Sequence, residues 1–416
     1  MKQSLLFIAA CLLVASTTTA QCDGLRFFNQ VFNDYTEIED IVYGENIDYQ
    51  GNVTELELDV YQPIGDTEAA RPLIIMVHGG SFISGSKDGP DVTSLAADFS
   101  KMGYVVASIN YRLGITIGLD LEASATESVI RGFHDGKAAV RYFRKDVAEN
   151  GNTYDINPDE IYMVGVSAGG FISLHVAYMD EVAEIPSWAD TTLPGLGGGI
   201  EGESGNAGYS SEVKGIVNIA GAIGDTAWMQ PADAPVLSFH GTNDGTVPFG
   251  SDVLQLLGID ITEVDGSSSV HEKANEIGLL NCFEIHEGQG HVPHVGNEAY
   301  YDTTRAIISN FIGSLVCPLT EMDCEYRELE LSSNDLQALE GLSIYPNPAR
   351  KTVTVEVPTQ ISSNSLTVYG IDGRIVDSFN ITSGVARLEV EGWASGIYIV
   401  EVNSNQGIIT ERLIIE

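Results

Sequence analysis

Residues Gly165 to Gly169 hold a serine, Ser167, between two glycines at the end of an apolar run. This spacing is typical of a serine nucleophile on a sharp turn between a strand and a helix, the G-x-S-x-G elbow. The turn projects the hydroxyl away from the sheet, and glycines are needed because a Cβ would meet the neighbouring backbone. The pattern predicts a serine that attacks a carbonyl carbon, provided that a base, an acid and oxyanion donors accompany it.

The predicted base is His291, which follows a predicted strand at 282–286 and is preceded by a glycine. Such a base takes the serine proton and needs a carboxylate to orient its ring. His286 and His294 are alternatives, although His286 ends the strand itself and His294 lies three residues beyond His291. Asp135 is predicted to have a structural role. The remaining histidines are predicted to have structural or surface roles: His78, His134, His175, His240 and His271.

The predicted acid is Asp244, which lies four residues beyond a buried strand at 235–240. Loops at the carboxyl ends of parallel strands converge on one edge of a sheet. The order Ser167, Asp244, His291 is also the one that this arrangement requires. Asp225 is an alternative acid because it follows a strand too, but it lacks the Gly-Thr-x-Asp context of Asp244.

Backbone N–H groups must also point at the oxyanion that develops during acyl transfer. Ala168, directly after the serine, is predicted to supply one donor. Gly80 and Ser81, in the glycine-containing run after the apolar stretch 73–77, are predicted to supply the others. That run could be an ordinary tight turn, but its place ahead of the elbow favours the oxyanion role.

Three aromatic residues are predicted to contact the substrate: Trp188, Tyr209 and Trp228. Trp188 and Tyr209 belong to a segment, 184–212, that is rich in glycine, serine and glutamate. A long irregular segment inside a compact domain is usually functional or disordered. It is either a lid over the serine or a plain surface loop, and Trp228 either lines a pocket or packs in the core.

The elements that position these residues alternate between strands and helices. Two half-buried strands at 37–62 precede buried strands at 73–77 and 104–109, and helical spacing covers 125–149. Such alternation is typical of a mostly parallel sheet with helices on both faces. The predicted fold class of this part is therefore α/β.

The two ends of the chain differ from this core. Residues 1–20 combine Lys2, an apolar run too short to span a bilayer and small residues for cleavage, which predicts a signal peptide. Residues 317–340 are predicted to be a linker, and 341–416 a small all-β sandwich of short alternating strands. The catalytic domain would then cover 21–316.

Composition argues against several partners. Lys and Arg number 20 against 59 Asp and Glu, a net charge of −39, so nucleic acid and anionic membranes are not expected to bind. No spacing matches a metal site, and no cofactor is expected. Four cysteines follow the signal peptide and allow three pairings, among which the sequence does not choose. Their spacing favours Cys317 with Cys324, and Cys22 with Cys282.

Residues 22–316 resemble carboxylesterases of the α/β-hydrolase superfamily, in the bacterial esterase and lipase group with a His-Gly-Gly oxyanion motif. The matching motifs lie in the order of that family, at 78–82, 110–113, 165–169, 240–244 and 290–291. Ser81 stands where many members have a third glycine, which leaves the choice of donors open. The resemblance implies hydrolysis of short acyl esters, of acetyl or feruloyl esters of polysaccharides, or of polyesters.

The tail resembles the C-terminal sorting domain of the type IX secretion system of Bacteroidetes, through residues 345–348, 368–374, 393–398 and 410–416. It implies export through the periplasm and outer membrane, the secretion machinery as a partner, and removal of the tail. Two other functions stay open. One is a serine peptidase of the same fold, which the lack of a large gating domain disfavours. The other is a catalytically silent surface binding protein, which the full set of site candidates disfavours.

Overall fold

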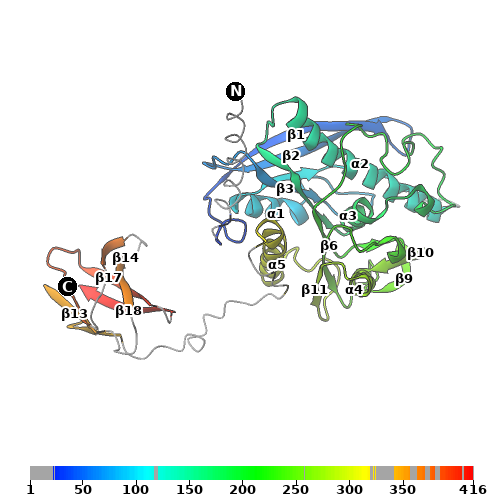
Figure 1. Cartoon of the computed structure of the whole chain (residues 1–416). Coiled ribbons are helices and arrows are strands. Elements are labelled where there is room, and N and C mark those ends of the chain that lie inside the picture. The colour runs from blue at the N-terminus through cyan, green and yellow to red at the C-terminus, as the bar shows by residue number, and fades with distance from the viewer. Residues whose placement is uncertain are drawn as a thin grey trace, which may run out of the picture. The chain divides into compact units, whose positions relative to one another are not determined.

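The computed structural model describes residues 22, 24–116, 120–256, 258–318, 322, 324, 342–356, 363–370, 375–379, 385–404 and 407–415. The chain divides into two compact units, 1–326 and 327–416 (Figure 1). Within the described ranges, no helix combines the length and the apolar character that a membrane span requires.

Unit 1 is built on an eight-stranded sheet in the order β1-β2-β4-β3-β5-β6-β8-β11. The first two strands run antiparallel to their neighbours, and all pairs from β4 to β11 are parallel. This is the mostly parallel α/β sheet that the strand and helix alternation predicts. Its strands are β1 (Tyr35–Ile47), β2 (Val53–Pro63), β3 (Arg71–Val77), β4 (Val105–Ile109), β5 (Ile156–Val166), β6 (Gly215–Ile219), β8 (Val236–Gly241) and β11 (Asn281–His286).

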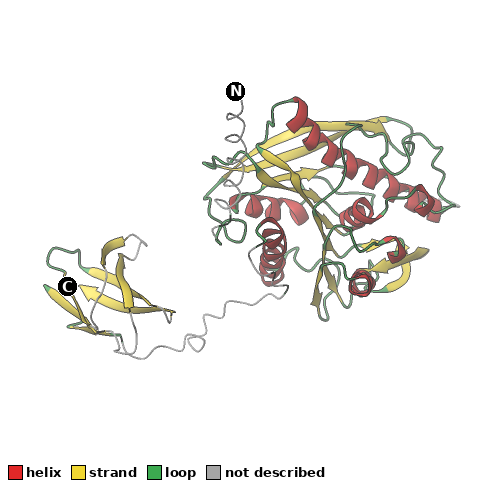
Figure 2. Cartoon of the chain, viewed as in Figure 1, coloured by secondary structure: helices red, strands yellow, loops and turns green. Residues whose placement is uncertain are grey.

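Helices cover both faces of this sheet (Figure 2). Alternate residues of β3 point to opposite faces, as the period of a strand requires. Ile75 packs in the cluster of Phe133 of α2, whereas Ile74 packs in the cluster of Phe99 of α1 and Phe311 of α5. The helices are α1 (Pro90–Lys101), α2 (Leu121–Glu149), α3 (Ala168–Tyr178), α4 (Ser267–Ile277) and α5 (Glu298–Val316), with short 3-10 helices η1 (Val182–Glu184) and η2 (Thr226–Trp228).

A second, three-stranded sheet stands beside the main one, in the order β7-β10-β9. It is formed by β7 (Ala222–Ile223), β9 (Ser251–Leu256) and β10 (Ile259–Gly266), and α4 follows directly. The sequence pattern predicts no element at residues 249–281. The hairpin β9–β10 matters for function because it forms a wall of the cavity described below.

Unit 2 is an all-β domain, as predicted. One sheet has the order β12-β13-β16 and the other β15-β14-β17-β18, and side chains of both, such as Val353 and Val400, share one apolar core. The strands are β12 (Ser343–Tyr345), β13 (Thr352–Glu356), β14 (Ser363–Gly370), β15 (Ile375–Phe379), β16 (Val385–Glu389), β17 (Gly396–Ser404) and β18 (Gly407–Ile415).

The cysteine pairing favoured by spacing is wrong. Cys22 is bonded to Cys317 and Cys282 to Cys324, with Cα–Cα distances of 5.6 and 5.4 Å. The reason is that the first described residues pack against the end of α5, where Phe28 lies against Gly313. Spacing along the sequence therefore predicted Cys324 as the partner of Cys317, whereas the partner is Cys22.

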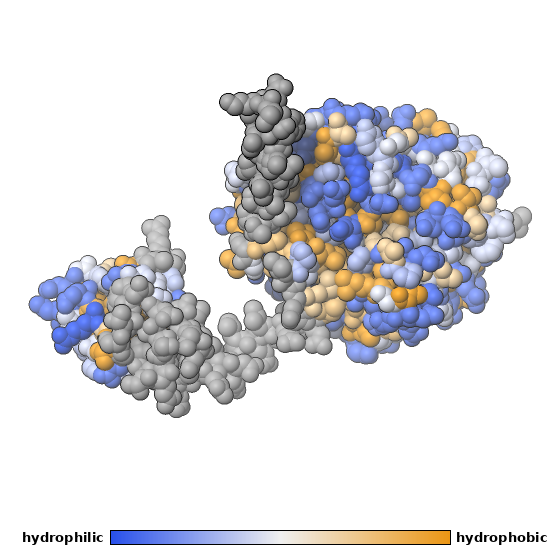
Figure 3. Space-filling view, viewed as in Figure 1, coloured by the Kyte–Doolittle hydropathy of each residue, from blue (hydrophilic) through white to orange (hydrophobic). Residues whose placement is uncertain are grey.

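The visible face of unit 1 mixes hydrophilic and hydrophobic residues (Figure 3). Two large apolar side chains on β1, Ile38 and Val42, are half exposed. With a net charge of −39, the surface carries far more carboxylates than cations. Mutual repulsion of such chains favours solubility.

Candidate active site

Ser167 lies at the junction of β5 and α3 with a backbone φ of 54° and ψ of −114°. Its N–H donates to the carbonyl oxygen of Ile219 on the neighbouring strand, at 2.8 Å. A Cβ on Gly165 would lie 2.0 Å from the carbonyl oxygen of Gly169, and one on Gly169 would lie 2.0 Å from that of Val77. The two glycines are therefore required by the close approach of strand, turn and helix, as the elbow motif predicts.

The structure brings the three predicted polar residues together at the carboxyl ends of the strands. His291 Nε2 lies 2.8 Å from Ser167 Oγ, and His291 Nδ1 lies 2.6 Å from Asp244 Oδ2. Asp244 follows β8 and His291 follows β11, two strands that pair in parallel. The three side chains form one continuous hydrogen-bonded chain.

The carboxylate of Asp244 is fully buried and well satisfied. Its Oδ1 accepts the N–H groups of Thr246 at 2.8 Å and Val247 at 3.0 Å, and its Oδ2 also lies 3.3 Å from His240 Nε2. Burial alone would raise the pKa of Asp244, but hydrogen bonds from His240 and His291 outweigh it and hold the pKa well below its ordinary value. An ionised Asp244 only accepts hydrogen bonds, so it holds the proton of His291 on Nδ1. The Nε2 lone pair then faces Ser167.

The glycine before His291 is not required by a close contact. Gly290 has open space around it, with the nearest atom, the carbonyl oxygen of Asn243, at 4.0 Å from an added Cβ. The loop instead depends on Gly288, which has a φ of 71°, and on Gly241, where a Cβ would meet the Gly290 carbonyl oxygen at 2.3 Å. The close contact is thus between the two loops that carry the base and the acid.

The oxyanion loop packs directly on the elbow. A Cβ on Gly79 would lie 3.2 Å from the Cβ of Ser167, and its N–H is already occupied by Asp91 Oδ2 at 2.8 Å. Among the described residues, the N–H groups of Gly80, Ser81 and Ala168 donate no recorded hydrogen bond. These three N–H groups, which are the predicted oxyanion donors, are therefore free to donate to a ligand oxygen. Ser81 and Ala168 line the cavity at the serine.

A cavity of about 1060 Å³ begins at Ser167 and is lined mainly by apolar residues. Its walls come from α3, from the N-terminal half of α2, from residues 183–188 and from the β9–β10 hairpin. Trp228 and Trp188, two of the three predicted substrate contacts, line it. Trp188 Nε1 donates to Thr126 Oγ1 of α2 at 3.1 Å, and Trp228 packs on His175 at 5.6 Å between ring centroids.

Tyr209 does not line this cavity, which corrects the prediction for that residue. Its hydroxyl donates to Glu149, the last residue of α2, on an exposed part of the surface. The N-terminal half of the same helix forms the cavity wall. Helix α2 is 29 residues long, so its two ends lie roughly 43 Å apart at 1.5 Å per residue.

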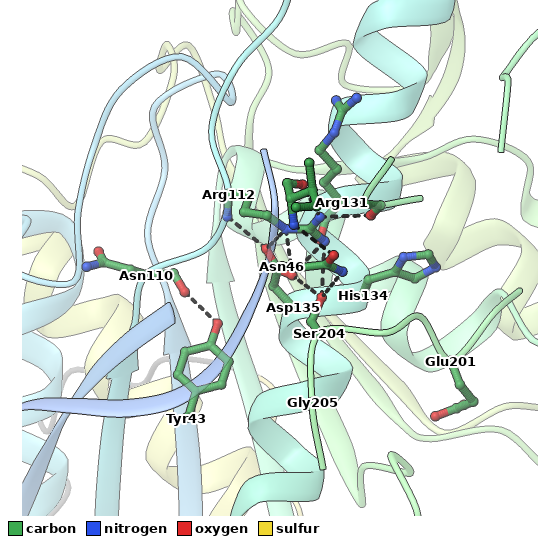
Figure 4. Close-up of polar contacts among 12 residues, drawn as sticks. Tyr43, Asn46, Asn110, Arg112, Arg131, His134, Asp135, Glu201, Ser204 and Gly205 are labelled. Atoms are coloured by element: carbon green, nitrogen blue, oxygen red, sulfur yellow. Dashed lines mark hydrogen bonds and ion pairs between the residues drawn. The ribbon is translucent and has the colours of Figure 1, made fainter. Parts of the chain in front are cut away.

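Segment 184–212 is held to the core by a buried ionic cluster (Figure 4). Arg112 binds Asp135 of α2 at 2.8 Å, and both side chains are fully buried. Arg112 Nη1 also donates to the carbonyl oxygen of Gly195, and Ser204 Oγ donates to Asp135 Oδ1 at 2.6 Å. Only the first residues of the segment, up to Trp188, reach the cavity. Residues 184–188 thus form part of the cavity wall, and the later part of the segment is anchored on α2, away from the cavity lining.

Asp225, the alternative acid, lines the cavity but accepts the N–H of Ala227 at 2.8 Å as the N-terminal cap of η2. His286 is buried against Tyr300, and His294 is buried as well. Burial lowers the pKa of His286 to about 4. Among the residues that the structure describes, no group of three or more His, Cys, Asp or Glu side chains could hold a metal ion.

Two parts of the site are not predicted from the sequence. His175 and Phe171 lie on the elbow helix at positions that face the cavity, and their spacing of four residues was a usable signal. The hairpin β9–β10 gave no comparable signal because its alternation of polar and apolar residues is weak.

The arrangement has the parts needed for acyl transfer. The Ser167 hydroxyl lies within reach of His291 for passing its proton, Asp244 accepts from the opposite side of that ring, and Ser81 and Ala168 line the cavity at the serine.

Parts of both units match known protein families. Residues 58–226 match the BD-FAE family, and residues 343–416 match the secretion system C-terminal sorting domain. A mouse protein, pyrethroid hydrolase Ces2a, is 33% identical over 29% of this chain and 21% of its own length. Lipase 2 of Geotrichum candidum is 30% identical over 30% of this chain and 22% of its own length. The chain thus spans about a fifth of the length of these curated relatives.

Solved structures of esterases are similar in arrangement. A truncated carbohydrate esterase from gut microbiota is 20% identical, with a TM-score of 0.47 over 70% of this chain and 99% of that chain. Thermogutta terrifontis esterase 2 phosphorylated by paraoxon is 20% identical, with a TM-score of 0.47 over 67% of this chain and 94% of that chain.

Proposed function

Because residues 58–226 belong to the BD-FAE family of α/β-hydrolases and residues 343–416 are a secretion sorting domain, we propose that this chain is an exported serine esterase. The observation that carries the proposal is the hydrogen-bonded chain from Asp244 through His291 to Ser167. It ends at the mouth of an apolar cavity, where an ester would present its carbonyl carbon.

The reaction follows in two halves. Ser167 Oγ attacks the ester carbonyl while His291 Nε2 takes its proton, and the tetrahedral oxyanion receives N–H groups from Gly80, Ser81 and Ala168. The protonated His291 then gives its proton to the leaving alcohol, and the acyl group stays on Ser167. Water, activated by the same histidine, releases the acid. The substrates proposed are short acyl esters, acetyl or feruloyl esters of polysaccharides, and polyesters.

The sorting domain indicates a secreted or cell-surface protein, and we propose processing at both ends. A leader at 1–20 would be removed, a catalytic domain at 21–316 would remain, and a linker at 317–340 would connect it to the sorting domain at 341–416. The predicted signal peptide lies outside the described residues. The partner of the tail would be the type IX secretion machinery.

Ser167→Ala tests the proposal directly. The wild-type chain should hydrolyse para-nitrophenyl acetate and should react with a fluorophosphonate probe on the peptide that contains Ser167, and the variant should do neither. Ser173→Ala is the matched control, because Ser173 is a buried serine of α3, the helix that follows Ser167, and its hydroxyl donates to the Gly169 carbonyl oxygen at 3.0 Å. A wild-type chain that turns over no ester and is not labelled on Ser167 would sink the proposal in favour of a binding role.

A further inference from the structure

The cavity follows one face of the elbow helix. Ala168, Phe171, His175 and Met179 line it at intervals of three or four residues, which is the spacing of one helix face. Helix α3 has 11 residues, so at 1.5 Å per residue this face extends about 16 Å from the nucleophile. A face of α2 lines the cavity as well, with Phe133 among its lining residues. The site is therefore a trough long enough for a ring-containing group.

His175 is the polar residue of α3 in this trough, and its ring orientation is set by the helix. Its Nδ1 lies 2.7 Å from the carbonyl oxygen of Phe171, an acceptor only, so Nδ1 carries the proton. The residue is 5% exposed, and among the described residues no partner is recorded for Nε2. That nitrogen is not sealed from solvent, unlike Nε2 of His78 and both ring nitrogens of His294. The Nε2 lone pair is thus left to the cavity.

The ring is neutral under ordinary conditions. Burial lowers the pKa of His175 to about 4, so the Nε2 lone pair is retained at neutral pH. A neutral imidazole with its proton on Nδ1 accepts a hydrogen bond at Nε2 and donates none. The complementary ligand group is a hydroxyl or another N–H or O–H donor.

Aromatic rings surround this acceptor. Phe171 and Phe133 lie nearly parallel to the His175 ring at centroid distances of 6.4 and 6.2 Å, and Trp228 meets it edge-on at 5.6 Å. Such surfaces favour flat apolar groups. An aromatic group with a hydroxyl at its far end would place the ring among these side chains and the donor at Nε2.

His175 is eight residues beyond Ser167, a rise of roughly 12 Å along the helix. Helical side chains lean toward the N-terminus, which brings the ring closer to the serine than its Cα is. An acetyl group bound at Ser167 is too short to reach it. Because the alcohol of a polymer-linked ester stays attached to a chain longer than this trough, we place the acyl group in it.

We propose that His175 is a specificity-determining residue that accepts a hydrogen bond from a hydroxyl at the distal end of an aromatic acyl group. This inference rests on the proposed esterase function and selects hydroxyaryl acyl esters among its substrate classes. Binding a ligand without the donor leaves Nε2 buried and unpaired, at a cost of about 1–3 kcal/mol, or roughly 5- to 150-fold in kcat/KM.

The test compares three methyl esters that differ in one substituent: para-hydroxycinnamate, cinnamate and para-methoxycinnamate. We expect the full-length wild-type chain to favour the hydroxyl ester over the other two by about tenfold or more in kcat/KM. His175→Phe keeps a ring of similar size without an acceptor, and should bring the ratio close to one. His175→Gln, whose side-chain oxygen can accept, should restore part of the preference.

Thr126→Val is the matched control, because it removes another oxygen from the trough wall, one that already accepts from Trp188. It should leave the ratio near the wild-type value. A wild-type ratio within about twofold of one, or a ratio that His175→Phe does not change, overturns the role of His175. Because the wild-type ratio is itself decisive, a variant that fails to fold does not remove the test.

Failure of the esterase proposal can be distinguished from failure of the inference on His175. A chain that hydrolyses para-nitrophenyl acetate and is labelled on Ser167, but shows no hydroxyl preference, disproves only the inference on His175. A chain that hydrolyses none of these esters disproves both.

Discussion

Replacing Asp244 by Asn tests the proposed mechanism most sharply. The change keeps the shape of the side chain but removes the negative charge that faces His291 Nδ1 at 2.6 Å. Asn can still accept the N–H groups of Thr246 and Val247 that now bind Oδ1. We therefore expect the loop to keep its conformation while the charge on His291 loses its partner.

The size of the effect follows from the burial of the pair. Two unit charges about 4 Å apart attract by roughly 4 kcal/mol at an effective dielectric constant of about 20. The attraction acts only once His291 is protonated, in the transition state, and 1.36 kcal/mol corresponds to tenfold in rate, so kcat should fall by about a thousandfold. An asparagine that turns its amide nitrogen toward Nδ1 would also favour the wrong tautomer and deepen the loss.

The assay is the initial rate on para-nitrophenyl acetate, with urea unfolding to show that the domain is intact. Asp225→Asn is the control, since Asp225 is the other carboxylate considered as the acid, and we expect its kcat to stay within about threefold of wild type. The assignment of Asp244 would be refuted if kcat of folded Asp244→Asn fell by less than about tenfold. It would also be refuted if kcat fell further in Asp225→Asn than in Asp244→Asn.

Three further results are expected. Asp135→Ala leaves Arg112 buried without its carboxylate and should lower the free energy of unfolding by about 3–5 kcal/mol in urea titrations; a change below about 1 kcal/mol would contradict this. Cys22→Ser should lower it by about 2–5 kcal/mol, and non-reducing peptide mapping of the wild type should recover Cys22 joined to Cys317. The pKa values of His134 and His175 are lowered from 6.5 to about 4 by burial, so the unfolded chain binds protons first as the pH falls. The free energy of unfolding should therefore decrease between pH 6.5 and about 4, and a flat urea midpoint over that range would be the contrary result.

Much of the α/β core could be predicted because its signals are local. The apolar run 73–77 and the glycines around Ser167 each report directly on burial or on a close backbone contact. Asp244 and His291 each follow a buried strand that can be recognised in the sequence. Because the carboxyl ends of parallel strands meet at one edge of the sheet, their proximity could be predicted.

The features that were missed depend on contacts between distant segments. The Cys22–Cys317 bond reflects the packing of the N-terminal residues on α5, which separation along the chain does not report. Tyr209 shares a segment with Trp188, but the anchoring of that segment by Arg112 and Asp135 directs its two halves to different ends of α2. His175 looked structural because one of its nitrogens does have a structural role, and only the cavity shows what the other faces.

The two disulfides bear on how unit 1 survives outside the cell. One joins Cys22 to Cys317, directly after α5, and the other joins Cys282 of β11 to Cys324. If leader and tail are cut away, the chain ends that remain lie beside a covalent bond to the folded core. Extracellular exopeptidases digest a protein from loose ends. Here an enzyme that trims inward from either end would reach a cross-link before it could release a strand or a helix.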